Sequence, residues 1–310
     1  MTAAQQLARV RLPDFVCVGV EKCGTTSLYD LLQQHPAIGL SRHKETHFFN
    51  SNWDKGVGWY REKFSHLDAH CLRIGEITPA YHRFPEVIPR IRQILGDGTK
   101  ILILLREPRQ RAFSHYIHDF ANQLEMTDLV YKRYLATCRY APIVRDYFTA
   151  FGEQQCLVQI FEEDFLPDPQ RLVDNICRFL GIASHPVTPV HSNPSRLPVA
   201  CWSPGYATTI QVEQDRLRVP AHSVVVFTGR KHNTRIITGL DQAQGDALIT
   251  KVANAVCFIP AMKSSIVYEQ NVHEDVEQVE QLIHRTLDCW RAALPDLHAP
   301  VTALPEFVRA

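Results

Sequence analysis

The sequence of 310 residues lacks the features of several extreme protein classes. Its 33 Lys and Arg balance 33 Asp and Glu, so we expect no surface-wide attraction to nucleic acid or another polyanion. No apolar stretch approaches the ~18 residues that a membrane span needs, so no stable membrane insertion is expected. The first residues also lack the charged-then-apolar pattern of a secretory signal.

Paired cysteine and histidine motifs are absent as well. Nine cysteines are scattered without a CxxC pair, and the 15 histidines include no HExxH motif. We therefore expect reduced thiols in a cytoplasmic protein, and no metal site. The oligomeric state cannot be read from the sequence.

Short apolar runs alternate with helix-periodic segments over the first 180 residues. Strands are predicted over 15–20, 72–77, 100–105 and 156–161, and helices over 27–34, 86–95, 110–120, 139–151 and 170–180. The run 100–105 is apolar on both faces, as is typical of a central parallel strand. The alternation predicts an α/β fold with three layers, in which a central, mostly parallel sheet is flanked by helices.

The composition changes after the last of these helices. Prolines concentrate in 185–205 and predict an extended loop, followed by a strand at 224–227 and a closing helix over 274–290. We predict one domain over 14–294, with a loop-rich segment at about 185–265. The tails are 1–13 and 295–310.

The segment 19–26, Gly-Val-Glu-Lys-Cys-Gly-Thr-Thr, has the glycine spacing of a phosphate-binding P-loop between a strand and a helix. In an ATPase loop, Lys directly follows the second glycine, whereas here Lys22 lies inside the loop. Strand 100–105 is followed by Arg106, where a magnesium-binding loop would have an acid. A cation there would repel magnesium and attract another anion. The alternative is an ordinary glycine-containing turn.

Four motifs resemble those of sulfotransferases that use 3′-phosphoadenosine 5′-phosphosulfate (PAPS), which have a P-loop-like fold. Segment 18–28 is similar to their 5′-phosphosulfate loop, and segment 105–116 to their 3′-phosphate motif. Lys-Glu-Thr-His-Phe-Phe at 44–49 and Glu-Ile-Thr-Pro-Ala-Tyr at 76–81 resemble the heparan-sulfate-type (N- and 3-O-) branch and its bacterial relatives. The motifs cover about residues 14–120 in the family's order. That branch has Lys where this chain has Ile77, which leaves the acceptor geometry open.

The resemblance implies a metal-independent transferase that moves the sulfuryl group of PAPS in line onto a hydroxyl or amine. The implied catalytic cation is Lys22, which would neutralise charge on the leaving phosphate oxygen. Segment 227–232 only faintly resembles a later phosphate loop of the family. The residues implied to bind the nucleotide are Lys22, Cys23, Gly24, Thr25, Thr26, Ser27, Arg106, Ser114 and Arg230.

The same resemblance implies an acceptor side of the site. Glu45 is the candidate general base that takes the acceptor's proton, and His47 is the rival base. The residues expected to contact substrate are Lys44, Glu45, Thr78, Pro79 and Tyr81. The acceptor itself is a carbohydrate, a lipid-linked molecule or a small molecule.

Two other functions stay open at this point. One is a magnesium-dependent P-loop nucleotide kinase or NTPase, and the other is a non-catalytic nucleotide-binding protein of the same fold. Dependence on magnesium separates the first from a sulfotransferase. The joint presence of Lys22, Glu45, Arg106 and Ser114 argues against the second.

Overall fold

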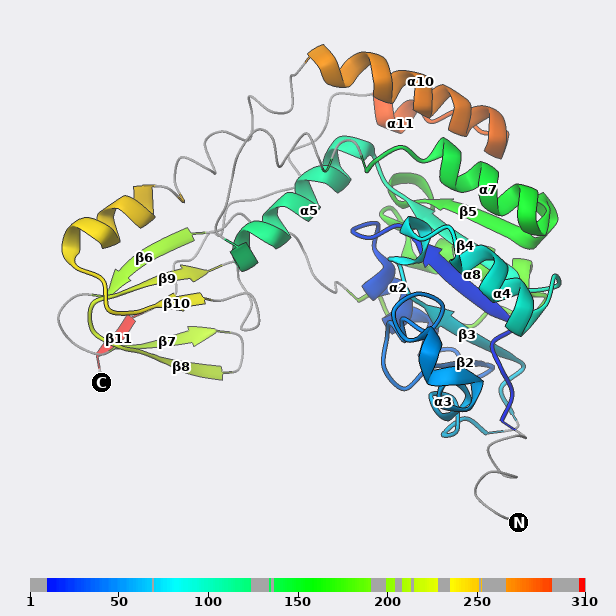
Figure 1. Cartoon of the computed structure of the whole chain (residues 1–310), viewed down its shortest axis with the longest axis horizontal. Coiled ribbons are helices and arrows are strands. Elements are labelled where there is room, and N and C mark those ends of the chain that lie inside the picture. Colours follow the sequence, from blue (N-terminus) through cyan, green and yellow to red (C-terminus); the bar gives the residue numbers. More distant parts are fainter. Residues whose placement is uncertain are drawn as a thin grey trace. The chain divides into compact units, whose positions relative to one another are not determined.

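The computed structural model (Figure 1) describes residues 10–68, 70–123, 134, 137–190, 199–203, 208–212, 215–227, 235–250, 252, 266–291 and 307–309. The chain divides into two compact units. One unit comprises Met1–Glu107, Arg139–Asn193 and His273–Arg291, and the other comprises Pro108–Cys138, Pro194–Val272 and Ala292–Ala310. The single domain expected over 14–294 stays a prediction.

The first unit is built on a five-stranded parallel sheet in the order β2-β3-β1-β4-β5. The strands are β1 (Phe15–Gly19), β2 (Ile38–Leu40), β3 (Arg73–Ile77), β4 (Lys100–Leu105) and β5 (Cys156–Ile160). All of β1, and β4 beyond its first residue, is buried, which explains their continuous apolar runs. Phe15 packs across Gly75 of β3, where a Cβ atom would lie 2.0 Å from the ring.

Helices flank this sheet, which confirms the predicted α/β fold. They are α2 (Thr25–Leu32), α3 (Gly56–Glu62), α4 (Val87–Leu95), α7 (Ala141–Phe151) and α8 (Pro169–Leu180). Single turns also occur at η1 (Trp53–Lys55), η2 (Tyr81–Arg83), η3 (Glu153–Gln155) and η4 (Phe161–Phe165). The apolar stripe predicted for 86–95 corresponds to α4, which buries Val87 and Ile91.

The closing helix differs from the single element predicted over 274–290. It consists of α10 (Ile266–Ile283) and α11 (Asp288–Arg291), separated by a turn in which His284 has a φ of 52°. Glu280 closes the turn, because its side chain accepts the Leu287 backbone N–H at 2.6 Å. Apolar periodicity continues across the break, so the sequence pattern alone does not reveal it.

The second unit contains α5 (Pro108–Gln123), two three-stranded sheets and a helix over 242–250. The sheet orders are β10-β9-β6 and β11-β7-β8. The strands are β6 (Val199–Ser203), β7 (Thr208–Val212), β8 (Asp215–Val219), β9 (Ser223–Phe227), β10 (Arg235–Ile237) and β11 (Phe307–Arg309). Only β9 was predicted.

The loop-rich segment expected at 185–265 and the tail expected at 295–310 therefore both contain strands. These strands have three to five residues each, and some of them pair over a long sequence distance, as β11 does with β7. Val224 and Val226 of β9 form a buried cluster with Val252.

Candidate active site

Four loops of the first unit meet where the parallel strands end. They follow β1, β3, β4 and β5, and comprise residues 20–24, 78–83, 106–107 and 161–165. Carboxyl ends of parallel strands lie at one edge of a sheet, which is where α/β folds bind ligands. The Val20 backbone N–H donates to Leu104 O at 2.8 Å, and the Thr78 N–H donates to Cys17 O at 3.1 Å. The first bond joins the loop after β1 to strand β4, and the second joins the loop after β3 to strand β1.

The loop between β1 and α2 has the form of a phosphate cradle. Lys22 and Gly24 both have positive φ values, 68° and 90°, and α2 starts directly after Gly24. The first N–H groups of a helix have no acceptor within the helix, so they and the helix dipole favour an anion there. The predicted phosphate residues Cys23, Thr25 and Ser27 are buried, and Thr26 is half-buried.

Gly24 is required by packing as well as by its backbone angle. A Cβ atom on Gly24 would lie 2.9 Å from the rings of both Phe161 and Phe165 in η4. The aromatic residues of η4, after β5, therefore pack directly against the phosphate loop at Gly24. Neither phenylalanine was predicted as a site residue, although their segment is compatible with the family pattern.

Arg106 connects β4 to the phosphate loop. Its Nη1 donates to Lys22 O at 3.3 Å, and its Cζ lies 4.8 Å from the centre of the Phe161 ring. The side chain is only 8% exposed, and its Nε has no hydrogen-bond partner within the described part of the chain. A buried guanidinium with an unused donor is suited to a planar fork of phosphate oxygens.

Two predicted nucleotide contacts fall outside this unit. Ser114 is buried in α5 of the second unit. Arg230 lies outside the described residues. Their roles stay predictions.

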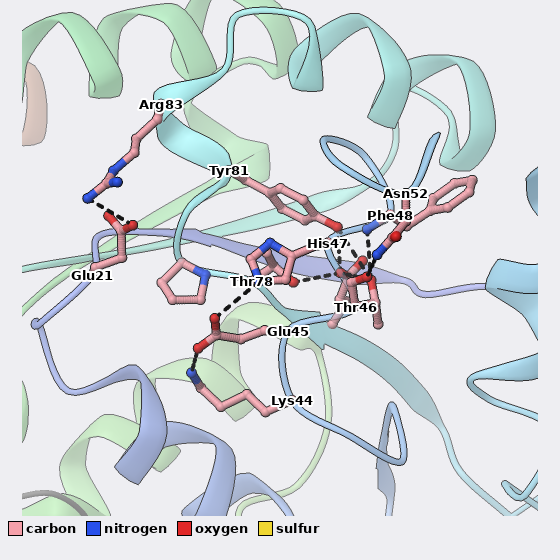
Figure 2. Close-up of polar contacts among 12 residues, drawn as sticks. Glu21, Lys44, Glu45, Thr46, His47, Phe48, Asn52, Thr78, Tyr81 and Arg83 are labelled. Carbon is pink, nitrogen blue, oxygen red and sulfur yellow. Dashed lines mark hydrogen bonds and ion pairs between the residues drawn. The ribbon is translucent and has the colours of Figure 1, made fainter. Parts of the chain in front are cut away.

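The acceptor motif forms a tight turn in which Glu45 lies between two cationic or titratable partners (Figure 2). Its carboxylate pairs with Lys44 Nζ, and its Oε2 lies 3.4 Å from His47 Nε2. Glu45 and His47 both have positive φ values, 66° and 51°. The Glu45 side chain is 36% exposed, so solvent or a substrate can reach it.

A buried carboxylate that the sequence did not single out holds this turn in place. Glu76 of β3 is 0% exposed and accepts hydrogen bonds from four hydroxyl groups. The donors are Thr46, Tyr60, Thr78 and Tyr81. Burial raises the pKa of Glu76, and the four hydroxyl donors partly offset that rise.

Thr78 and Tyr81 therefore face Glu76, and both side chains are fully buried. Their contact with substrate stays a prediction. In the structure, their hydroxyl groups donate to the buried Glu76 carboxylate. Pro79 contributes its carbonyl, which lies 2.7 Å from His82 Nδ1. Its predicted contact with substrate is equally untested.

An ion cluster joins the loop after β3 to the phosphate loop. Arg83 Nη2 lies 3.1 Å from Glu21 Oε1 (Figure 2). His82 Nε2 lies 3.5 Å from Glu21 Oε2. Glu21 directly precedes Lys22 in the chain. The cluster therefore connects the phosphate loop, at the residue before Lys22, to the loop 78–83 that follows β3.

Within the described residues, no group of three His, Cys, Asp or Glu is arranged to hold a metal ion. A search of the same residues also finds no helix with the length and apolarity of a membrane span.

Comparison with known proteins identifies the family. Residues 12–195 match the family model of the sulfotransferase domain, which is more than half of the chain. The chain belongs to the sulfotransferase family. The resemblance stated from the four motifs is thus confirmed.

Curated relatives match over shorter stretches. Membrane-associated sulfotransferase kil1 of Dictyostelium discoideum is 40% identical over 108 residues, which are 34% of this chain and 22% of that protein. Human heparan sulfate glucosamine 3-O-sulfotransferase 5 is 39% identical over 108 residues, 34% of this chain and 30% of that protein. Human bifunctional heparan sulfate N-deacetylase/N-sulfotransferase 2 is 29% identical over 198 residues, which are 56% of this chain and 22% of that protein. The match covers less than a third of each relative.

One solved structure matches over most of the chain. A sulfotransferase from Alicyclobacillus acidocaldarius aligns with a TM-score of 0.57 and 25% identity, over 91% of this chain and 100% of that one.

Proposed function

We propose that this sulfotransferase takes its sulfuryl group from PAPS and transfers it to a hydroxyl or amine of a glycan or small molecule. The observation that carries the proposal is Arg106, whose buried Nε is unused within the described residues. It lies beside a phosphate cradle, with its Nη1 on the Lys22 carbonyl. Two neighbouring candidate anion sites suit a nucleotide with separate 5′ and 3′ phosphates.

Bound PAPS would supply the activated sulfuryl group, and the residues of this chain would do the rest. The turn from Cys23 to Ser27 would hold the 5′-phosphate through backbone N–H groups. Arg106 would hold the 3′-phosphate. Lys22 would stabilise the electron pair left on the phosphate oxygen when its bond to sulfur breaks.

Glu45 would accept the proton of the acceptor as the new bond to sulfur forms. Its exposure and its position in the acceptor turn support this role, with Lys44 and His47 as partners that orient it. The two human relatives are named for heparan sulfate, which supports a carbohydrate acceptor. Ile77 supports an acceptor geometry that differs from that of the heparan-sulfate-type branch, because it places an apolar side chain at the end of β3 where that branch has Lys.

Binding of the desulfated product, 3′-phosphoadenosine 5′-phosphate (PAP), tests the donor. Calorimetry should show that PAP binds at least tenfold more tightly than AMP, because AMP lacks the 3′-phosphate. Magnesium should leave both affinities unchanged. Equal affinities for PAP and AMP, or binding that requires magnesium, would instead favour a kinase or NTPase. The predicted cytoplasmic location stays a separate proposal, which cell fractionation tests.

A further inference from the structure

The turn η4 lies against both phosphate-binding loops. Its Phe161 ring packs under the Arg106 guanidinium and, with Phe165, against Gly24. Its Glu162 Oε1 accepts the backbone N–H of Glu107 at 3.0 Å. The position of η4 thus determines where the turn 106–107 lies after β4.

The C-terminal helices hold the other side of η4. Trp290 of α11 donates its Nε1–H to Glu162 Oε2 at 2.9 Å. Arg285, in the turn between α10 and α11, pairs with Glu163 at 2.6 Å and with Asp164 at 2.8 Å. One carboxylate, that of Glu162, therefore links Trp290 directly to the backbone beside Arg106.

A second connection reaches Arg106 from α10, which lies beside α7 in Figure 1. Asp275 accepts the backbone N–H groups of Tyr140 at 2.7 Å and of Ala141 at 3.2 Å, which caps α7. The Tyr140 hydroxyl then donates to the Arg106 carbonyl at 2.8 Å. Asp275 and Tyr140 are both buried, so neither bond competes with bulk water.

We propose that α10 and α11 set the affinity for the 3′-phosphate by fixing the turn 106–107, with Trp290 and Asp275 as positioning residues. The proposal rests on the proposed use of PAPS. Both helices lie outside the matched residues 12–195, so the family model assigns them no such role. A guanidinium fixed before binding loses less freedom when the phosphate arrives.

Trp290→Phe tests this in the full chain, because it keeps an aromatic side chain and removes the Nε1–H donor. Calorimetry should show that PAP binds about tenfold more weakly, the scale of losing a hydrogen bond to a charged group. AMP affinity should change less than about twofold, because AMP has no 3′-phosphate. Asp275→Asn should lower the PAP-to-AMP preference in the same direction.

Arg291→Gln is the matched control, because Arg291 is the neighbour of Trp290 in α11. Among the described residues it pairs with Glu280 of α10 at 2.7 Å and with Asp288, and with no residue of η4. It should leave both affinities unchanged. Unchanged PAP affinity in Trp290→Phe, or equal losses for PAP and AMP, would overturn the positioning role. If Trp290→Phe does not fold, Glu162→Gln is judged by the same two criteria. A wild-type chain without preference for PAP overturns the proposed function, whereas an unaltered preference in the variants overturns this inference alone.

Discussion

Lys22 lies in the loop between β1 and α2, where Arg106 contacts its backbone. Its carbonyl accepts a hydrogen bond from Arg106 Nη1, and its φ is positive. Charge on the leaving oxygen grows toward the transition state, and Lys22 should stabilise it most there. Lys22→Ala should therefore lower saturated turnover by ~10²–10³.

The same experiment should separate Lys22 from Arg106. PAP affinity should fall less in Lys22→Ala than in Arg106→Ala, whose main loss should be in affinity. Nucleotide affinity and saturated turnover are measured for both variants. A Lys22→Ala variant that loses affinity alone would make Lys22 a phosphate anchor.

Glu45 and His47 lie 3.4 Å apart, so their roles need a direct comparison. Glu45→Gln keeps shape and hydrogen-bonding groups but cannot take a proton, and turnover should fall by ~10²–10⁴. PAP affinity should remain near that of the wild type. Normal turnover in Glu45→Gln, together with an inactive His47→Asn, would assign the base to His47.

Glu76 should give the stability of the fold a defined pH dependence. Burial raises its pKa above the ordinary value of 4.5, so the folded chain binds this proton more tightly than the unfolded chain. Its contribution to stability is thus largest below pH 4.5 and declines as the pH rises through the raised pKa.

The readout is the difference in unfolding free energy between wild type and Glu76→Gln, measured against pH by urea denaturation. Glutamine does not titrate, so other groups cancel in the difference. The wild type's advantage should shrink as the pH rises above 4.5. A difference that is flat, or that grows with pH, would show that Glu76 is not held with a raised pKa.

The sequence motifs single out charged residues of the candidate site. They do not reveal most of the buried contacts that fix the loops around those residues. Lys22, Glu45 and Arg106 stand out because each lies in a motif that resembles one of the sulfotransferase family. Glu76 begins the motif 76–81, but the motif did not reveal that Thr46 and Tyr60 also donate to it. Glu162 gave no signal, because its partner Trp290 lies 128 residues away. Which hydroxyl or indole reaches a carboxylate depends on tertiary packing.

At the scale of elements, the contact between the phosphate loop and η4 yields a test with a matched control. Gly24 and Gly181 both adopt left-handed backbone angles at helix ends. Only Gly24 also faces two rings, because the nearest atom to a Cβ on Gly181 would be Arg73 Nη2 at 3.8 Å. Alanine should cost about 1–2 kcal/mol of unfolding free energy at either position for the backbone angle alone.

Gly24→Ala should lose a further ~1–3 kcal/mol through overpacking, and should also weaken PAP binding. Chemical denaturation and calorimetry measure the two effects. Equal stability losses in both variants, with intact PAP affinity in Gly24→Ala, would mean that η4 does not fix the loop.

A buried apolar strand was predictable from the sequence, whereas a very short strand and a break inside a helix were not. The strand predicted over 100–105 coincides with β4, because a buried central strand is apolar throughout. β2 has three residues and was missed, since so short a run carries no period. The break between α10 and α11 depends on Glu280 reaching Leu287, which the apolar periodicity does not record.

At the scale of the whole molecule, a balanced net charge does not exclude a local pair of cations. The chain has no net charge, yet the loops after β1 and β4 each place a cation, Lys22 or Arg106, at one edge of the sheet. In the proposed reaction, these two cations would balance the phosphate charge that magnesium balances in P-loop kinases. A third, divalent cation would be repelled there.

Sulfuryl transfer should therefore continue in the presence of excess EDTA, with turnover within about twofold of the untreated enzyme. The measurement is the rate of PAP formation from PAPS with an acceptor mixture, before and after chelation and again after magnesium is restored. Lys22→Ala, assayed in parallel, shows whether magnesium can replace the missing ammonium, and we expect no rescue because Arg106 remains. Loss of wild-type turnover on chelation, with recovery on adding magnesium, would mean that a metal ion balances the phosphate charge and that the two cations do not suffice.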